Sequence, residues 1–78
     1  MSIVVERQQA EHAVDSLNRG DWLQLLDREG VATYAKVAWI NARRSVVLMV
    51  RHPDRRALSM RAEELLERLR RGRAARLG

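Results

Sequence analysis

The spacing of apolar residues changes twice along the chain, and this double change restricts the folds open to it. Over residues 6–18 apolar side chains recur three or four positions apart, as on one face of a helix. Over residues 21–59 they form short or alternating runs separated by turn residues, as in β-strands. Helical spacing returns over residues 60–71. The pattern therefore predicts an α+β domain in which a run of strands lies between two helices.

Both expected helices carry an apolar stripe at positions i, i+3, i+4 and i+7. The stripes are Ala10, Ala13, Val14 and Leu17 in the first helix and Ala62, Leu65, Leu66 and Leu69 in the second. Ser59 is placed to cap the second helix, and Gly72 to end it. Gly20 follows the first helix in the same way. Ile3–Val5 either extend the first helix or form an extended lead-in.

The middle of the chain fits four antiparallel strands. The first three cover residues 21–27, 31–41 and 45–51, and a short fourth strand covers residues 56–59. Gly30 lies in the first turn, where it can take a positive φ. One face of the second strand carries Val31, Ala35, Val37 and Trp39, and the other carries Tyr34 and Lys36. The third strand, SVVLMV, is apolar on both faces, so we expect both to be covered.

So few strands twist strongly, and a twisted meander tends to curl on itself. We therefore expect a small, partly open antiparallel β-barrel flanked by an N-terminal and a C-terminal helix. Residues 72–78 are expected to form a basic, frayed tail.

Length and charge narrow the classes of protein further. Seventy-eight residues make one small domain, and the absence of cysteine removes disulfides and thiolate zinc sites. Neither a signal peptide nor an apolar run of about 20 residues is present, so we expect a cytoplasmic protein without membrane contact. The net charge of +5 belongs to the C-terminal end. Residues 1–67 hold ten basic and ten acidic side chains, and five arginines follow them.

A succession of short motifs resembles a known bacterial module. Their order is Gly20-Asp21-Trp22, AKVAWI at 35–40, a strand ending in Val50-Arg51, then Ser59, Glu64-Leu65, Leu69-Arg70 and Gly72. This succession spans 53 of the 78 residues and resembles the C-terminal module of a large bacterial family of unknown function. Members of that family are often labelled thymidine phosphorylase, a name that the residues of this module do not support. The module is similar to PilZ domains, small β-barrels of which many bind cyclic di-GMP.

The resemblance implies a PilZ-like fold in which Trp22 and Trp39 pack between sheet and helix. Cyclic di-GMP binding in PilZ domains uses an RxxxR segment before the first strand and a later (D/N)xSxxG, and neither is present here. The resemblance therefore implies a non-catalytic regulatory or protein-interaction module with degenerate cyclic di-GMP motifs. The alternative is a cyclic di-GMP-binding relative whose clamp is Arg51, Arg55 and Arg56.

A further alternative is a small nucleic-acid-binding protein that uses its basic C-terminus. The candidate phosphate contacts are Arg70, Arg71, Arg73 and Arg76. A helix followed by a small barrel is also similar to Sm-like RNA-binding ring proteins, although their loop motifs are missing. Because the chain lacks Phe and both tryptophans lie in expected strands, we expect no exposed aromatic platform of the kind that single-strand binders use.

No catalytic or metal signature is visible in the sequence. His12 faces away from the apolar stripe, and His52 lies in a turn beside Asp54 without a nucleophile. Two histidines without cysteine make no zinc set. We therefore expect no enzyme, no cofactor and no metal. The expected partner is another protein, the rest of a larger polypeptide or a second copy, reached through a free sheet edge, Tyr34 or the second helix.

Overall fold

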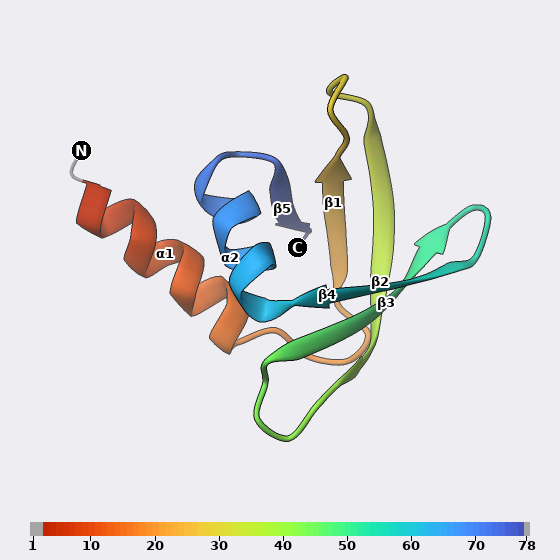
Figure 1. Ribbon diagram of the computed structural model, residues 1–78, viewed down its shortest axis with the longest axis horizontal. Coiled ribbons are helices and arrows are strands. Elements are labelled where there is room, and N and C mark those ends of the chain that lie inside the picture. Colours follow the sequence, from red (N-terminus) through yellow and green to blue (C-terminus); the bar gives the residue numbers. More distant parts are fainter. Residues whose placement is uncertain (1–2, 78) are drawn as a thin grey trace.

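The computed structural model describes residues 3–77, with side chains from residue 8 onward. The elements are α1 (Ile3–Asp15), β1 (Trp22–Leu26), β2 (Ala32–Ile40), β3 (Val46–His52), β4 (Arg56–Arg61), α2 (Ala62–Arg70) and β5 (Ala74–Leu77). The expected order of helix, four strands and helix is confirmed, and a fifth strand follows it (Figure 1). Residues 3–77 form a small α+β domain with two helices and one five-stranded antiparallel sheet.

The first helix begins and ends three residues earlier than the expected range of 6–18. Its apolar stripe packs as expected, because Ala10 and Leu17 are buried and Val14 packs against the core. Leu17 lies beyond the helix, where its amide donates to the carbonyl of Val14 at 3.2 Å. Arg44, from the β2–β3 turn, then donates to the carbonyls of Val14 (3.1 Å) and Leu17 (2.6 Å). These bonds satisfy carbonyls that a helix end leaves without partners.

The strands pair in the order β4-β3-β2-β1-β5, and all neighbours are antiparallel. The sheet is not closed, because β4 and β5 form its two edges. Figure 1 shows β3 and β4 crossing β1 and β2 steeply, which is the strong twist expected of short strands. Gly30 in the β1–β2 turn has a φ of 83°, and Gly20 before β1 has a φ of 95°. Both positions require the left-handed conformation that favours glycine, as the sequence predicted for Gly30.

The C-terminal segment is not a frayed tail. Residues 72–78 contain β5, which pairs with β1 and places Ala74 opposite Leu25. Ala74 is buried in the core. The four residues AARL have no strand pattern of their own, so only pairing with the exposed edge of β1 makes them extended.

The second helix begins two residues later than expected, because β4 continues as far as Arg61. Ser59 is an exposed strand residue and does not cap the helix. Arg61 is the N-cap, and no side-chain hydrogen bond caps the helix there. Glu63 and Glu64 lie in the first turn, as expected, where carboxylates suit the helix dipole. The helix closes at Gly72, which has a φ of 72°.

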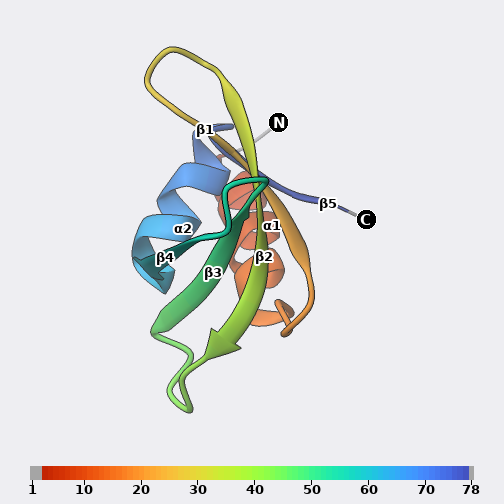
Figure 2. The ribbon, with the colours of Figure 1, turned by 90° about the vertical axis from the view of Figure 1, so that its right-hand side faces the viewer.

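The hydrophobic core lies between one face of the sheet and the two helices. Its buried residues are Leu17, Leu23, Leu25, Ala35, Val37, Val47, Met49, Met60, Leu65 and Ala74. Both helices lie on this side of the sheet, and Figure 2 shows β2 and β3 in front of α1 with their opposite face toward the viewer. We call that opposite face, which neither α1 nor α2 covers, the outer face.

The third strand is therefore covered on one side only, contrary to expectation. Val47 and Met49 are buried, whereas Val46, Leu48 and Val50 are only half-buried. The apolar run indicated a strand with two covered faces, but a sheet with both helices on one side covers only one.

Both tryptophans lie on the outer face and not, as expected, between sheet and helix. Trp22 precedes the buried Leu23 and therefore points the other way. Trp39 is 54% exposed. The register of β2 shifts between Val37 and Trp39, so a β-bulge turns Trp39 outward and lets Ile40 pack against the core.

Candidate binding surfaces

The turn between β3 and β4 separates the three arginines expected to form a clamp. Arg51 donates to the carboxylate of Asp54, with Nε and Oδ1 3.2 Å apart, and lines a cleft beside α2. Arg55, at a φ of 56°, lines a groove on the outer face. Arg56 is exposed and lines neither hollow. The hydrogen bond from Arg51 holds the pKa of Asp54 below its usual value and raises the pKa of Arg51. The three guanidinium groups do not converge on one site.

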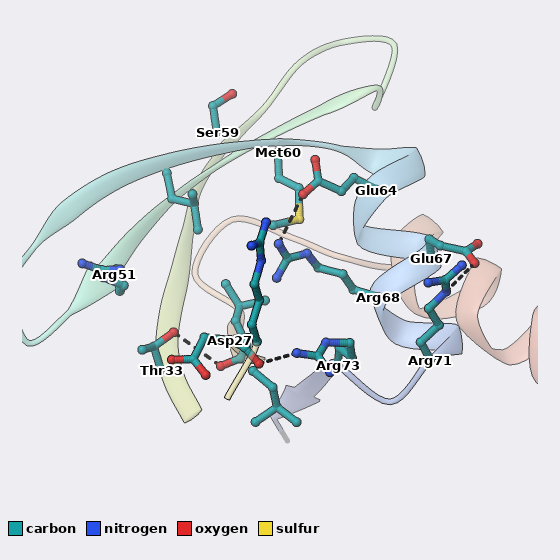
Figure 3. Close-up of a pocket in the computed structure, with 14 residues that line it drawn as sticks. Asp27, Thr33, Arg51, Ser59, Met60, Glu64, Glu67, Arg68, Arg71 and Arg73 are labelled. Atoms are coloured by element: carbon teal, nitrogen blue, oxygen red, sulfur yellow. Dashed lines mark hydrogen bonds and ion pairs between the residues drawn. The ribbon is translucent and has the colours of Figure 1, made fainter. Parts of the chain in front are cut away.

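A cleft of about 520 Å³ lies between the ends of β1 and β4 and helix α2 (Figure 3). Leu25, Leu58 and Met60 form its apolar part. The charged side chains that line it are Arg28, Arg51, Arg68, Arg71 and Arg73 together with Asp27, Glu64 and Glu67. We call this hollow the arginine cleft.

Carboxylates already occupy much of the hydrogen-bonding capacity of the arginine cleft. Arg68 pairs with Glu64 at 3.4 Å, and Nε of Arg71 donates to Glu67 at 3.0 Å. The hydrogen bond from Arg71, with a smaller contribution from the neighbouring Arg70, lowers the pKa of Glu67. An anionic ligand would have to displace these carboxylates or lie beside them, and both cost free energy. Arg28, which has no ion pair among the described residues, and Arg73, which binds the backbone carbonyl of Asp27, also line the cleft, so only part of its positive charge is neutralised.

The four C-terminal arginines named as phosphate contacts all bind other parts of the chain. Their partners are Glu67 for Arg70 and Arg71, the backbone carbonyl of Asp27 for Arg73, and the carboxylate of Asp21 for Arg76 at 3.0 Å. The pairs with Glu67 lie within α2 and its C-cap, whereas Arg73 and Arg76 attach the C-terminal segment to residues next to β1. The basic C-terminus is thus a structural element and not a free arm.

The outer face is the second candidate surface. Strand alternation and pairing place on it Trp22, Gln24, Tyr34, Lys36, Trp39, Leu48, Val50, His52, Ser59, Arg61 and Leu77. Three large side chains on this face are well exposed, namely Trp39 at 54%, Tyr34 at 43% and Leu77 at 40%. None of the five strands contains an acidic residue. This face therefore combines exposed rings with positive charge, and the expectation that no exposed aromatic platform is present was wrong.

A groove of about 650 Å³ on the outer face has Trp22 in its wall. The ring of His52 packs against the indole of Trp22 with centroids 4.9 Å apart and planes tilted by 54°. Nζ of Lys36 lies 5.9 Å from the centroid of the same indole, within the range of a cation–π interaction. Arg19 and Arg55 also line the groove, and its lining includes no carboxylate.

The sequence contained a signal for this surface that the strand-by-strand interpretation missed. Leu23 and Leu25 alternate as core residues, and this alternation alone points Trp22 outward. Trp39 and Ile40 are adjacent, so in regular alternation only one of them can face the core. Which of the two does so depends on the bulge, which no turn residue marks.

The histidines do not form the His–Asp pair that their spacing allows. His52 packs against Trp22, whereas Asp54 binds Arg51. His12 is exposed on α1. Among the residues that the structure describes, no group of three or more histidine or carboxylate side chains is arranged to hold a metal ion.

Neither helix within residues 3–77 has the length and hydropathy needed to cross a lipid bilayer. Comparison with known proteins gives no match to this chain, whether among family models, curated proteins or solved structures.

Proposed function

We propose that the protein is a non-catalytic binding module whose outer face is its binding surface. Its sheet would correspond to a PilZ-like, partly open barrel, and it would act in a regulatory or interaction role in a bacterial cytoplasm. The observation that carries the proposal is the position of Trp39, which is 54% exposed on a face that neither helix covers.

The composition of the outer face supports a binding role. Tyr34 and Leu77 are exposed on it together with Trp39, and the half-buried Leu48 pairs with Trp39 across the sheet. Tryptophan and tyrosine are enriched at the centres of interfaces. A domain that has placed aliphatic side chains in its core and both indoles outside has surface available for a partner.

The two alternatives receive less support from the geometry. A cyclic di-GMP clamp would need Arg51, Arg55 and Arg56 on one surface, but Arg51 binds Asp54 and Arg55 lines a different hollow. A nucleic-acid contact through the C-terminus would use arginines that are already bound, Arg70 to Glu67 within α2 and Arg76 to Asp21 before β1. The basic residues in the groove of the outer face lie in one hollow and form no ion pair among the described residues.

The proposal is tested by photo-crosslinking in cells that produce the protein. p-Benzoylphenylalanine replaces Trp39 in one variant and Arg71, an exposed residue that lines the arginine cleft, in the other. We expect a discrete adduct after irradiation from position 39 and none from position 71. Absence of any adduct at position 39, or equal adducts at both positions, would show that the outer face is not the binding surface.

A further inference from the structure

We propose that the occupant of the outer face is a single-stranded nucleic acid. Its bases would stack on Trp39 and Tyr34, and its phosphates would lie beside Lys36, Arg19 and Arg55. This inference rests on the binding role proposed for the outer face and names the partner of that same surface.

Charge is the first argument. The groove contains Lys36, Arg19 and Arg55, and none of the three forms an ion pair within the described part of the chain. In the arginine cleft, by contrast, Arg51, Arg68 and Arg71 are each paired with a carboxylate. Arg28 and Arg73 of the arginine cleft also lack a carboxylate partner among the described residues, but the lining of that cleft includes three carboxylates and the lining of the groove includes none. The groove therefore offers a polyanion positive charge without a competing carboxylate.

The arrangement of the rings is the second argument. Trp39 pairs with Leu48, Lys36 pairs with Val50, and Tyr34 pairs with His52. These three pairs are successive rows of the outer face, about 7 Å apart along β3. Exposed rings therefore lie on both sides of a cationic row. Binding sites for single strands combine the same two features, a basic track for the backbone and aromatic rings that accept any base.

A single strand fits this surface better than the other macromolecular occupants. The bases of a duplex are stacked on each other and cannot reach flat rings on a sheet. A protein partner would have to bring carboxylates to the row of Lys36 as well as an apolar surface to Trp39. Every nucleotide supplies both a π-face and a phosphate.

The test is fluorescence anisotropy at low and rising salt with three fluorescein-labelled probes. The probes are a 20-nucleotide oligo(U) RNA, an oligo(dT) DNA of the same length and a duplex DNA of equal length. We expect the single strands to bind more tightly than the duplex. Trp39→Ala should weaken binding by about 5- to 150-fold, the range for the loss of one stacked base, and Trp39→Phe should restore much of it. Lys36→Ala should reduce the slope of log Kd against log salt by about 0.7, as for one lost phosphate contact.

Arg71→Ala is the matched control, since it also removes one positive charge but lines the arginine cleft and not the outer face. It should change binding less than twofold, and circular dichroism shows whether each variant is folded. Equal weakening by Lys36→Ala and Arg71→Ala, with no effect of Trp39→Ala, would mean attraction by net charge only and would overturn the inference. Absence of binding to both single strands at low salt would also overturn it.

The crosslinking result separates failure of this inference from failure of the proposed function. An adduct at position 39 that protease removes and nuclease does not, together with no binding of the oligonucleotides, leaves a protein-docking module. Absence of any adduct rejects both proposals. An adduct sensitive to nuclease supports both.

Discussion

At the scale of single residues, the partner of each basic side chain decides what it can do. The chain has 15 lysine and arginine residues and a net charge of +5. Arg70, Arg71 and Arg76 bind carboxylates of the same chain and are thereby used for structure. Lys36 has an indole beside it instead of a carboxylate, so its charge stays available on the surface. Counting charges along the sequence cannot reveal this difference.

Glu67 provides a residue-scale prediction, because it accepts hydrogen bonds from Arg70 and Arg71. The pKa of Glu67 is lowered in the folded protein, chiefly by the hydrogen bond from Arg71. Folding therefore favours its charged form, and the stability it contributes is present above the ordinary glutamate pKa of about 4.3. That contribution is lost as the pH falls through the lowered value. We expect Glu67→Gln to lower the urea midpoint slightly at pH 7 and to flatten the loss of stability below about pH 4.5.

Glu29→Gln is the control, since Glu29 is an exposed carboxylate in the β1–β2 turn with no ion pair among the described residues. Urea unfolding monitored by circular dichroism at several pH values measures both variants. If Glu67→Gln and Glu29→Gln had the same profile of midpoint against pH, the paired arginines would not be stabilising the folded state through Glu67.

At the scale of elements, the last strand depends most on its neighbours. β5 is four residues long and has no acidic residue and no apolar alternation. It is extended because β1 offers a free edge and because the preceding turn at Gly72 reverses the chain. Pairing on this side gives β1 two neighbours and makes β4 and β5 the edges of the sheet.

Removal of residues 73–78 should therefore destabilise the whole domain. The truncation exposes the edge of β1, removes the buried Ala74 and releases Asp21 from Arg76. We expect a large fall in the urea midpoint with loss of a cooperative transition, measured by circular dichroism. Arg76→Ala, which keeps the strand, should cost only about 1 kcal/mol or less, as for a partly exposed ion pair. An unchanged midpoint in the truncated protein would show that β5 does not stabilise the sheet.

At the scale of the whole molecule, the core is one-sided. Both helices pack on the same face of the sheet. The core on that side contains aliphatic residues and methionine, and both tryptophans lie on the outer face. A domain of 78 residues has limited apolar surface to bury. Because the two indoles lie outside the core, the domain loses part of the stabilisation that their burial would give. The binding role proposed for the outer face accounts for that arrangement.

This arrangement predicts an unusual order of mutational costs. Leu65 is 0% exposed, so Leu65→Ala should lower the free energy of unfolding by about 2–5 kcal/mol. Trp39→Ala removes a larger side chain from a half-exposed position and should cost only about 1 kcal/mol or less. Urea denaturation followed by circular dichroism measures both. A loss for Trp39→Ala as large as that for Leu65→Ala would mean that the indole belongs to the core.

The sequence alone was sufficient for the order of the elements, the faces of both helices and the turn at Gly30. These features depend on local periodicity and on backbone conformation within a few residues, and the structure agrees with them. It was not sufficient for β5, for the bulge that turns Trp39 outward or for the uncovered face of β3. Each of these depends on which segments meet in space: the edge of β1 for β5, the register of β2 against β3 for Trp39, and the side chosen by both helices for the outer face. Local sequence propensity cannot predict these tertiary contacts, because they join residues that are far apart along the chain.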